Sequence, residues 1–161
     1  MAKGIAGHQV HGGHEEWLTP KWLVDELGPF DLDPCSPIER PWPTAWHHYT
    51  IEDDGLAQPW FGRVWCNPPY DDKSGAWLDR CADHGNAIAL IFARTETKTF
   101  EKVWQRAHGL LFLRGRLTFH YVDGTKARAN GGAPSVLIAY DAGTAAHLRS
   151  AWLRGHFVPL R

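Results

Sequence analysis

The second half of the chain alternates apolar runs with amphipathic segments, and this alternation restricts the fold more than any other feature. Residues 87–92 form a continuous apolar run, which is typical of a central strand buried on both faces. Amphipathic segments at 74–84 and 98–107 flank this run, and another apolar run follows at 110–113. Strands that alternate with helices indicate βαβ winding. The pattern predicts a compact α/β fold with a mostly parallel central sheet and helices on both faces.

The C-terminal part of the chain predicts a different pairing. Residues 117–121 and 136–140 are apolar-rich segments joined by a glycine-rich loop, and we expect them to form an antiparallel strand pair. Residues 142–154 predict a closing helix with Trp152 on its inward face.

Length and composition favour a single domain. Residues 1–14 lack hydrophobic periodicity and predict a flexible N-terminal arm, which leaves 15–161 as one domain. The arm carries His8, His11 and His14, but no further residues complete a four-ligand shell, so we expect no metal site. Three cysteines without a Cys-x-x-Cys pair indicate reduced thiols in the cytoplasm. No signal-peptide pattern opens the chain, and 43% hydrophobic with 22% charged residues is the composition of a globular protein, with no membrane partner expected.

Val64 to Tyr70 has the pattern of a buried strand that stops at a rigid turn. Pro68 and Pro69 fix φ and remove backbone donors, so the strand cannot continue. The side-chain oxygen of Asn67 and the carbonyl of Pro68 can accept the two hydrogens of an exocyclic amine, and Tyr70 offers a ring on which a flat group can stack. An amine held in this way presents its nitrogen lone pair to an electrophile. The alternative is a proline-stiffened turn in which Asn67 caps backbone groups and Tyr70 packs.

Two acidic positions mark a candidate ligand site before this turn. Residues 30–35, Phe-Asp-Leu-Asp-Pro-Cys, predict a short strand that ends near Asp33, and ligands bind at the carboxyl ends of strands in open α/β sheets. Asp33 can accept hydrogen bonds from an amino group or ribose hydroxyls, or it can cap the following turn. Asp54 is a second candidate, with a solvated turn as its alternative.

Positive charge is concentrated between residues 94 and 128, although the whole chain has a formal net charge of −1. Three acids stand in this segment, against eight basic residues, namely Arg94, Lys98, Lys102, Arg106, Arg114, Arg116, Lys126 and Arg128. Such a cluster fits a nucleic-acid phosphate backbone; the alternative is a solvated helix face and a basic loop.

Several segments, taken in order, make the chain from Thr19 to Tyr140 resemble a known family. They are Thr19-Pro20, Phe30-Asp31-Leu32-Asp33-Pro34-Cys35, Asp54-Gly55-Leu56, Asn67-Pro68-Pro69-Tyr70, Arg94-Thr95-x-Thr97, Gly115-Arg116-Leu117-x-Phe119 and Ala133-Pro134-Ser135. The chain is similar to the phage-type DNA N6-adenine methyltransferase (Dam) family, whose fold is the Rossmann-like class I S-adenosylmethionine-dependent methyltransferase fold.

The resemblance implies methyl transfer from S-adenosyl-L-methionine to the N6 amine of an adenine flipped out of double-stranded DNA. The implied catalytic residues are Asn67, Pro68, Pro69 and Tyr70. The implied cofactor-binding residues are Thr19, Pro20, Asp33, Pro34, Cys35, Asp54 and Asn67. Together with the charge cluster, the resemblance predicts DNA contacts from Arg94, Thr95, Arg116, Lys126 and Arg128. It also suggests a phage or prophage gene, action in the host cytoplasm and a role such as restriction–modification.

One departure from the wider class keeps alternatives open. Methyltransferases usually place glycines after the first strand, where backbone approaches the cofactor, and residues 33–37 contain none. The chain could therefore be a DNA-binding protein that keeps the fold without turnover. Asn-Pro-Pro-Tyr turns also occur in methyltransferases of RNA bases and protein glutamine amides. The sequence leaves the oligomeric state, monomer or homodimer, open.

Overall fold

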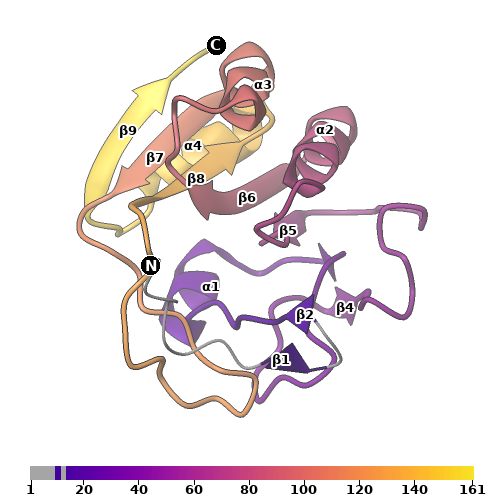
Figure 1. Ribbon diagram of the computed structural model, residues 1–161. Helices are drawn as coiled ribbons and strands as arrows, with labels where there is room; N and C mark the ends of the chain where they lie inside the picture. The colour runs from indigo at the N-terminus through magenta and orange to yellow at the C-terminus, as the bar shows by residue number, and fades with distance from the viewer. Residues whose placement is uncertain (1–9, 12–13) are drawn as a thin grey trace.

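The computed structural model describes residues 10–11 and 14–161 (Figure 1). The elements are β1 (Val10–His11), β2 (His14–Glu15), α1 (Lys21–Leu27), β3 (Leu32–Asp33), β4 (His47–His48), β5 (Val64–Cys66), α2 (Ser74–His84), β6 (Ala87–Phe92), α3 (Lys98–Arg106), β7 (Gly109–Leu113), β8 (Ser135–Ala139), α4 (Ala142–Ser150) and β9 (Gly155–Pro159). Most of the predicted flexible arm, residues 1–9 and 12–13, lies outside the described residues. The described remainder of this region contains the short antiparallel pair of β1 and β2.

Seven strands form one mixed sheet in the order β4-β3-β5-β6-β8-β7-β9. The pairs β4-β3, β3-β5 and β5-β6 are parallel, whereas β6-β8, β8-β7 and β7-β9 are antiparallel. The predicted α/β class is confirmed, but the prediction of a mostly parallel sheet is wrong. The reason is that β8 returns between β6 and β7, so it adds antiparallel contacts in the middle of the sheet.

The predicted strand at 117–121 is absent from the described fold. Both edges of β8 are already paired with β6 and β7, so no edge is left for this segment. Leu117 and Phe119 are nevertheless buried, which explains their strand-like apolar pattern. Their backbone instead accepts hydrogen bonds from the following loop, from Gly131 N to Leu117 O and from Ala127 N to Phe119 O.

The predicted closing helix is too long. Helix α4 ends at Ser150, and residues 155–159 form β9, which pairs with the edge strand β7. Trp152, expected to face inward, lies in the connection between the two elements and is 93% exposed. The free edge of β7 supplies backbone partners for β9, and this long-range pairing prevails over the continuation of the helix.

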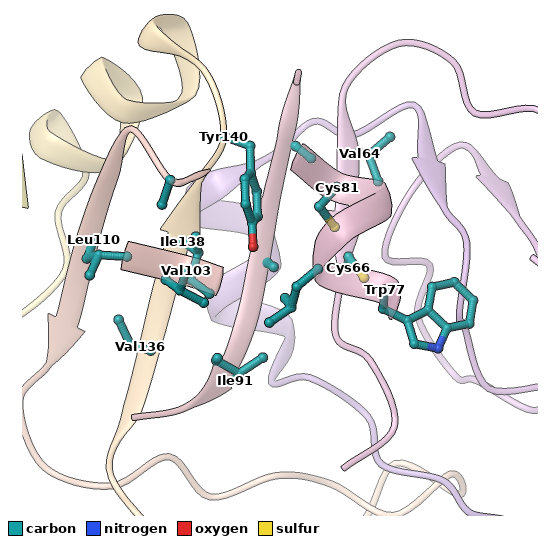
Figure 2. Packing of buried hydrophobic residues seen from close by; sticks show 14 of the residues in the cluster. Val64, Cys66, Trp77, Cys81, Ile91, Val103, Leu110, Val136, Ile138 and Tyr140 are labelled. Carbon is teal, nitrogen blue, oxygen red and sulfur yellow. The ribbon is translucent and has the colours of Figure 1, made fainter. Parts of the chain in front are cut away.

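The helices cover both faces of the sheet, as predicted (Figure 1). Alternate residues of β6 explain why its apolar run is continuous. Ala89 and Ile91 face α2 and α3, whereas Ile88 and Leu90 face α1 and α4. Figure 2 shows the first of these cores, in which Cys81 from α2 lies near Cys66 of β5 and Val103 from α3 lies near Ile138 of β8.

The sheet brings the candidate residues together because β3, β5 and β6 are parallel neighbours. Their carboxyl ends therefore meet at one edge of the sheet. Asp33 ends β3, Asn67 directly follows β5, and Phe92 ends β6. None of the helices in the described part of the chain is long and apolar enough to cross a membrane.

Candidate active site

The side chain of Asn67 is held from two sides at this edge. Its Nδ2 donates a hydrogen bond to Thr19 Oγ1 at 3.3 Å, and its Oδ1 accepts one from the Tyr70 hydroxyl at 3.1 Å. The backbone carbonyl of Asn67 also accepts from Cys35 Sγ at 3.3 Å. The turn after β5 is therefore tied to the segments before α1 and after β3.

Tyr70 follows the two prolines, and its side chain is 38% exposed. Its ring stacks on Phe92, with centroids 4.4 Å apart and planes inclined by 15°, and meets Phe119 edge-on at 6.4 Å. Desolvation raises the pKa of the Tyr70 hydroxyl well above its ordinary value. The hydroxyl therefore stays protonated and acts as the donor to Asn67.

The two prolines connect this turn to helix α2. Pro68 is buried and Pro69 is exposed. The Ser74 hydroxyl, at the start of α2, donates to the carbonyls of Pro69 and Asp71. The prolines limit φ, and the serine closes the loop, so the direction in which Asn67 and Tyr70 project is set locally.

A cavity of about 730 Å³, here called the larger cavity, opens beside the turn. Its walls come from three strand ends or loops, 34–37, 50–56 and 67–71. Of the predicted cofactor-binding residues, it brings together Pro34, Cys35, Asp54 and Asn67. Charged side chains of Glu16, Asp71 and Lys73 and the apolar surfaces of Ile51, Leu56 and Trp77 complete the lining.

Gly55 explains how the loop with Asp54 packs so closely on the turn after β3. A Cβ atom at Gly55 would lie 1.9 Å from the carbonyl oxygen of Pro34, so only glycine fits. Asp54 itself has a φ of 53°, in the left-handed region that aspartate tolerates. The glycine missing from residues 33–37 is thus matched by a glycine on the loop that faces them.

Asp33 lies behind the wall of the larger cavity and does not line it. The residue is 3% exposed, and its carboxyl accepts hydrogen bonds from Cys35 N at 3.1 Å and from the Thr44 hydroxyl. Burial raises the pKa of this carboxyl to about 6, although both hydrogen bonds act in the opposite direction. In the structure Asp33 therefore orders the turn at Pro34 and Cys35, which does line the cavity.

The raised pKa of Asp33 predicts a pH-dependent stability. A folded-state pKa of about 6, above the ordinary 3.8, means that a proton binds the folded protein more tightly than the unfolded chain. Ionised Asp33 destabilises the fold above pH 6, and protonation relieves this as the pH falls from about 6 towards 3.8. Between about pH 7.5 and pH 5, the wild-type free energy of unfolding is expected to rise by ~1.4 kcal/mol relative to Asp33→Asn.

Urea unfolding of both proteins at constant ionic strength measures this difference. The comparison with Asp33→Asn is necessary because His48 acts in the opposite direction. Burial lowers the pKa of His48 to about 4, so its contribution to stability is lost as the pH falls through about 6.5. A wild-type to variant difference that is the same at both pH values would contradict the prediction.

A smaller cavity of about 430 Å³ lies on the other side of Tyr70. Its lining includes six aromatic residues, namely Trp17, Tyr70, Phe92, Phe100, Phe119 and Tyr121. Polar groups at its rim come from the turn between β6 and α3 and from the loop before β8, namely Arg94, Thr97, Asn130 and the backbone of Gly131 and Gly132. Tyr70 is a wall of both cavities, so the turn after β5 separates them.

Thr19 and Pro20, predicted to bind the cofactor, line neither cavity. Pro20 precedes the first turn of α1. The Thr19 carbonyl accepts a hydrogen bond from Trp42 Nε1 at 3.1 Å, and its hydroxyl contacts Asn67. Both residues thus belong to the support of the site.

The predicted DNA-binding residues surround the smaller cavity unevenly. Arg94 lines it, and its guanidinium lies 5.9 Å from the centre of the Phe92 ring. Three further cations, Arg116, Lys126 and Arg128, are exposed or partly exposed and lie in the segments next to the lining residues Phe119 and Ala127. The guanidinium of Arg116 donates a hydrogen bond to the carbonyl of Gly132. Thr95 is exposed in the turn that follows β6.

Two cations of the charge cluster have a different role. Lys102 and Arg106, both on α3, form ion pairs with Asp79 of α2 at 2.5 and 3.5 Å. Arg106 also pairs with Asp83 at 2.6 Å. These two cations connect α3 to α2 through ion pairs, an arrangement that neither interpretation of the charge cluster predicted.

Five aromatic residues of the smaller cavity were not predicted as site residues by the sequence analysis, namely Trp17, Phe92, Phe100, Phe119 and Tyr121. Phe92 is the last residue of a buried run, and its position at the carboxyl end of a central strand was a usable signal. Phe119 was not recognised as a cavity residue because residues 117–121 were assigned to a strand.

Among the described residues, no group of three or more His, Cys, Asp and Glu side chains is arranged to hold a metal. His8 of the N-terminal arm lies outside the described residues.

Comparison with known proteins assigns the chain to a family. A family model described as DNA N-6-adenine-methyltransferase (Dam) matches residues 8–148, which include the turn at Asn67, both cavities and the basic loop. A search of curated proteins and a search of solved structures each gave no match. The chain belongs to the DNA N-6-adenine-methyltransferase (Dam) family, and the protein is a DNA adenine-N6 methyltransferase.

Proposed function

We propose that the protein transfers a methyl group from S-adenosyl-L-methionine to the N6 amine of an adenine flipped out of double-stranded DNA. The observation that carries this proposal is the position of the Asn67-Pro68-Pro69-Tyr70 turn between two cavities. The larger cavity suits a polar cofactor, and the smaller cavity suits a flat ring. The acceptor atom Asn67 Oδ1 is directed at Tyr70, which lines both cavities together with Trp17 and Asp71.

The larger cavity fits the cofactor in size and chemistry. About 730 Å³ lies within the range of roughly 300–1,000 Å³ typical of small-molecule sites. Glu16 and Asp54 supply carboxylates for amino and hydroxyl groups, Lys73 supplies a cation for a carboxylate, and Trp77 supplies an apolar surface. Asp33 acts indirectly, by ordering the turn of Pro34 and Cys35. When bound, the cofactor supplies an electrophilic methyl group on a sulfonium centre.

The chain's own contribution is to hold the adenine amine. Asn67 Oδ1 and the carbonyl of Pro68 are the two acceptors proposed for its two hydrogens, and no described residue donates to the Pro68 carbonyl. The Tyr70 hydroxyl occupies Oδ1 in the structure, so the amine has to displace it. Fixing the amine in one direction turns an encounter into an aligned reaction, which supplies much of the rate.

Charge stabilisation supplies a second part of the rate. The amine nitrogen becomes positively charged as it takes the methyl group, and the oxygens of Asn67 and Pro68 stabilise that charge. The cationic nitrogen then releases a proton to solvent. No strongly basic side chain is needed before the attack, which fits a turn made of an amide, two prolines and a phenol.

The smaller cavity is the proposed site of the flipped adenine. Extrusion of a base costs a few kcal/mol, and stacking on aromatic side chains returns ~1–3 kcal/mol for each base. The pair of Tyr70 and Phe92 already forms a stacked platform at the wall of this cavity.

An enzyme with this substrate acts where the DNA lies, which is the cytoplasm of a bacterial cell.

The experiment that tests the proposal uses the purified protein, labelled S-adenosylmethionine and unmethylated genomic DNA. Digestion to nucleosides and mass spectrometry should detect N6-methyladenine and no other methylated nucleoside. Parallel reactions with RNA and with a protein mixture test the alternative substrates. Label in those reactions without N6-methyladenine in DNA would overturn the proposal.

DNA affinity is expected to fall steeply with added salt, because exposed cations beside the smaller cavity contact phosphates. Each phosphate contact contributes a slope of about −0.9 in a plot of log affinity against log salt. Arg94→Ala and the double variant Lys126→Ala with Arg128→Ala should lower this slope by about one for each lost contact. Fluorescence anisotropy with a duplex measures it.

Lys21→Ala is the matched control for these variants. Lys21 is an exposed cation on α1 that pairs with Asp25 at 2.5 Å. Its removal should leave the salt slope unchanged. A flat salt response of the wild-type protein, or an equal change in the control, would count against phosphate contacts at the smaller cavity.

A further inference from the structure

Trp60 does not line the larger cavity, but it contacts two residues that do. Its indole Nε1 donates a hydrogen bond to the carbonyl oxygen of Gly55 at 2.8 Å, and its ring stacks on Trp77 of α2 with centroids 6.3 Å apart. We infer that Trp60 is a positioning residue that fixes loop 50–56 relative to α2 and thereby sets the affinity of the larger cavity for the cofactor. This inference rests on the proposed function and deepens it.

The hydrogen bond between Trp60 and Gly55 has only one possible direction. An indole N–H can only donate, and a backbone carbonyl can only accept. Gly55 is buried, and its carbonyl accepts no other hydrogen bond from the described part of the chain. A buried carbonyl that loses its donor is unfavourable. Removal of the indole N–H therefore favours a shift of the loop at Gly55.

A shift at Gly55 changes the shape of the larger cavity, because this residue is in close contact with two of its walls. A Cβ atom on Gly55 would lie 1.9 Å from the carbonyl oxygen of Pro34 and 3.3 Å from the ring of Trp77. Asp54 and Leu56, its neighbours in the chain, line the cavity. Movement of the loop therefore moves the carboxylate of Asp54 relative to Pro34 and Trp77.

Trp60 can hold the loop because it is itself held on α2. The Arg80 guanidinium lies 5.2 Å from the centre of the Trp60 ring, and His84 meets this ring edge-on at 6.0 Å. Both residues belong to α2. Arg80 also donates to the carbonyl of Gln58 at 3.3 Å. His84 Nε2 lies 2.8 Å from the carbonyl oxygen of Gly62. The chain is thus tied to α2 before and after Trp60.

The effect is expected on cofactor affinity and not on the chemical step. Residues 50–56 contribute to the larger cavity and not to the smaller one. The turn with Asn67 and Tyr70 is held by different contacts, from Ser74 to the carbonyls of Pro69 and Asp71. Turnover at saturating cofactor should therefore stay near the wild-type rate.

The test uses Trp60→Phe, which keeps an aromatic ring and removes the N–H donor. The Kd of S-adenosylhomocysteine, measured by calorimetry well below the melting temperature, is expected to rise about three- to tenfold. The KM for S-adenosylmethionine should rise by the same factor, while kcat and the KM for DNA stay within about twofold of wild type. A role in stability alone would lower the melting temperature without changing the Kd of the folded protein.

The matched control is Trp152→Phe, the same substitution at a tryptophan that is 93% exposed and lines neither cavity. Its Kd should equal that of wild type. An unchanged Kd for folded Trp60→Phe, an equal change in the control, or a lower kcat with unchanged KM would overturn the inference.

Hydrogen exchange of the wild-type protein tests the inference even if Trp60→Phe does not fold. S-adenosylhomocysteine should slow amide exchange in residues 50–56 and also in 57–60, none of which lines the cavity. Unchanged exchange in 57–60 would contradict the coupling between Trp60 and the cofactor.

The outcomes also distinguish the inference from the proposed function. A wild-type protein that does not bind S-adenosylhomocysteine contradicts both. Normal binding without N6-methyladenine contradicts the proposed acceptor, and the comparison of Kd values still decides the role of Trp60. Wild-type activity together with wild-type affinity of Trp60→Phe contradicts only the positioning role.

Discussion

Replacement of Asn67 by alanine is expected to abolish methyl transfer while the protein stays folded. The variant loses the side-chain oxygen that is proposed to accept from the adenine amine and to stabilise the charge that develops on its nitrogen. Removal of one such preorganised group typically lowers kcat by about 10²- to 10³-fold. The residue follows β5 and is only partly buried, so its truncation leaves the hydrophobic cores unchanged. Single-turnover formation of N6-methyladenine measures the loss.

The matched control for this variant is Asn86→Ala. Asn86 is an exposed asparagine in the turn before β6, away from both cavities. Its replacement should leave the rate within about twofold of wild type. Thermal melting and binding of S-adenosylhomocysteine should show that Asn67→Ala is folded and still binds a cofactor analogue. Near-normal turnover of folded Asn67→Ala would rule out the proposed mechanism.

Replacement of Tyr70 by alanine is expected to lower the rate on duplex DNA by about 10- to 100-fold. The variant loses the ring that stacks on Phe92 at 4.4 Å and separates the two cavities. Stacking of a base on an aromatic ring contributes ~1–3 kcal/mol, which corresponds to this range of rates. Methylation rates of a duplex at saturating cofactor measure the effect.

Tyr70→Phe is the control that isolates the ring from the hydroxyl. It keeps the stacking surface and removes the hydrogen bond to Asn67 Oδ1. This hydroxyl competes with the adenine amine for the same acceptor, so the phenylalanine variant should retain wild-type activity or exceed it slightly. Equal losses in Tyr70→Ala and Tyr70→Phe would assign the role to the hydroxyl instead of the ring.

The two cavities give these predictions a common physical basis. Asn67 and Tyr70 stand on one turn, but they act on different sides of it. Asn67 borders the larger cavity and is the proposed acceptor, whereas Tyr70 borders both and is the proposed stacking surface. A change at Asn67 is therefore expected to affect chemistry alone, and a change at Tyr70 to affect the capture of the flipped base as well.

The sequence by itself determined those features that depend on neighbouring residues. Pro68 and Pro69 end β5 and place Asn67 and Tyr70 side by side, because proline restricts φ wherever the chain lies. The periodic apolar residues of α2 and α3 and the uniform run of β6 likewise predicted helices and a strand buried on both faces. These patterns follow from local backbone preference and the spacing of side chains.

Features that depend on which strand edges remain free follow from the packed fold and not from local sequence. The pairing of β8 with β6 and β7 excluded residues 117–121 from the sheet, and the free edge of β7 drew residues 155–159 into β9. The contact of Thr19 with Asn67 spans 48 positions, and the buried Asp33 accepts a hydrogen bond from Thr44, 11 positions along the chain. Backbone hydrogen-bonding groups can pair with any free edge, so this choice depends on the whole packed sheet and cannot be read from local sequence.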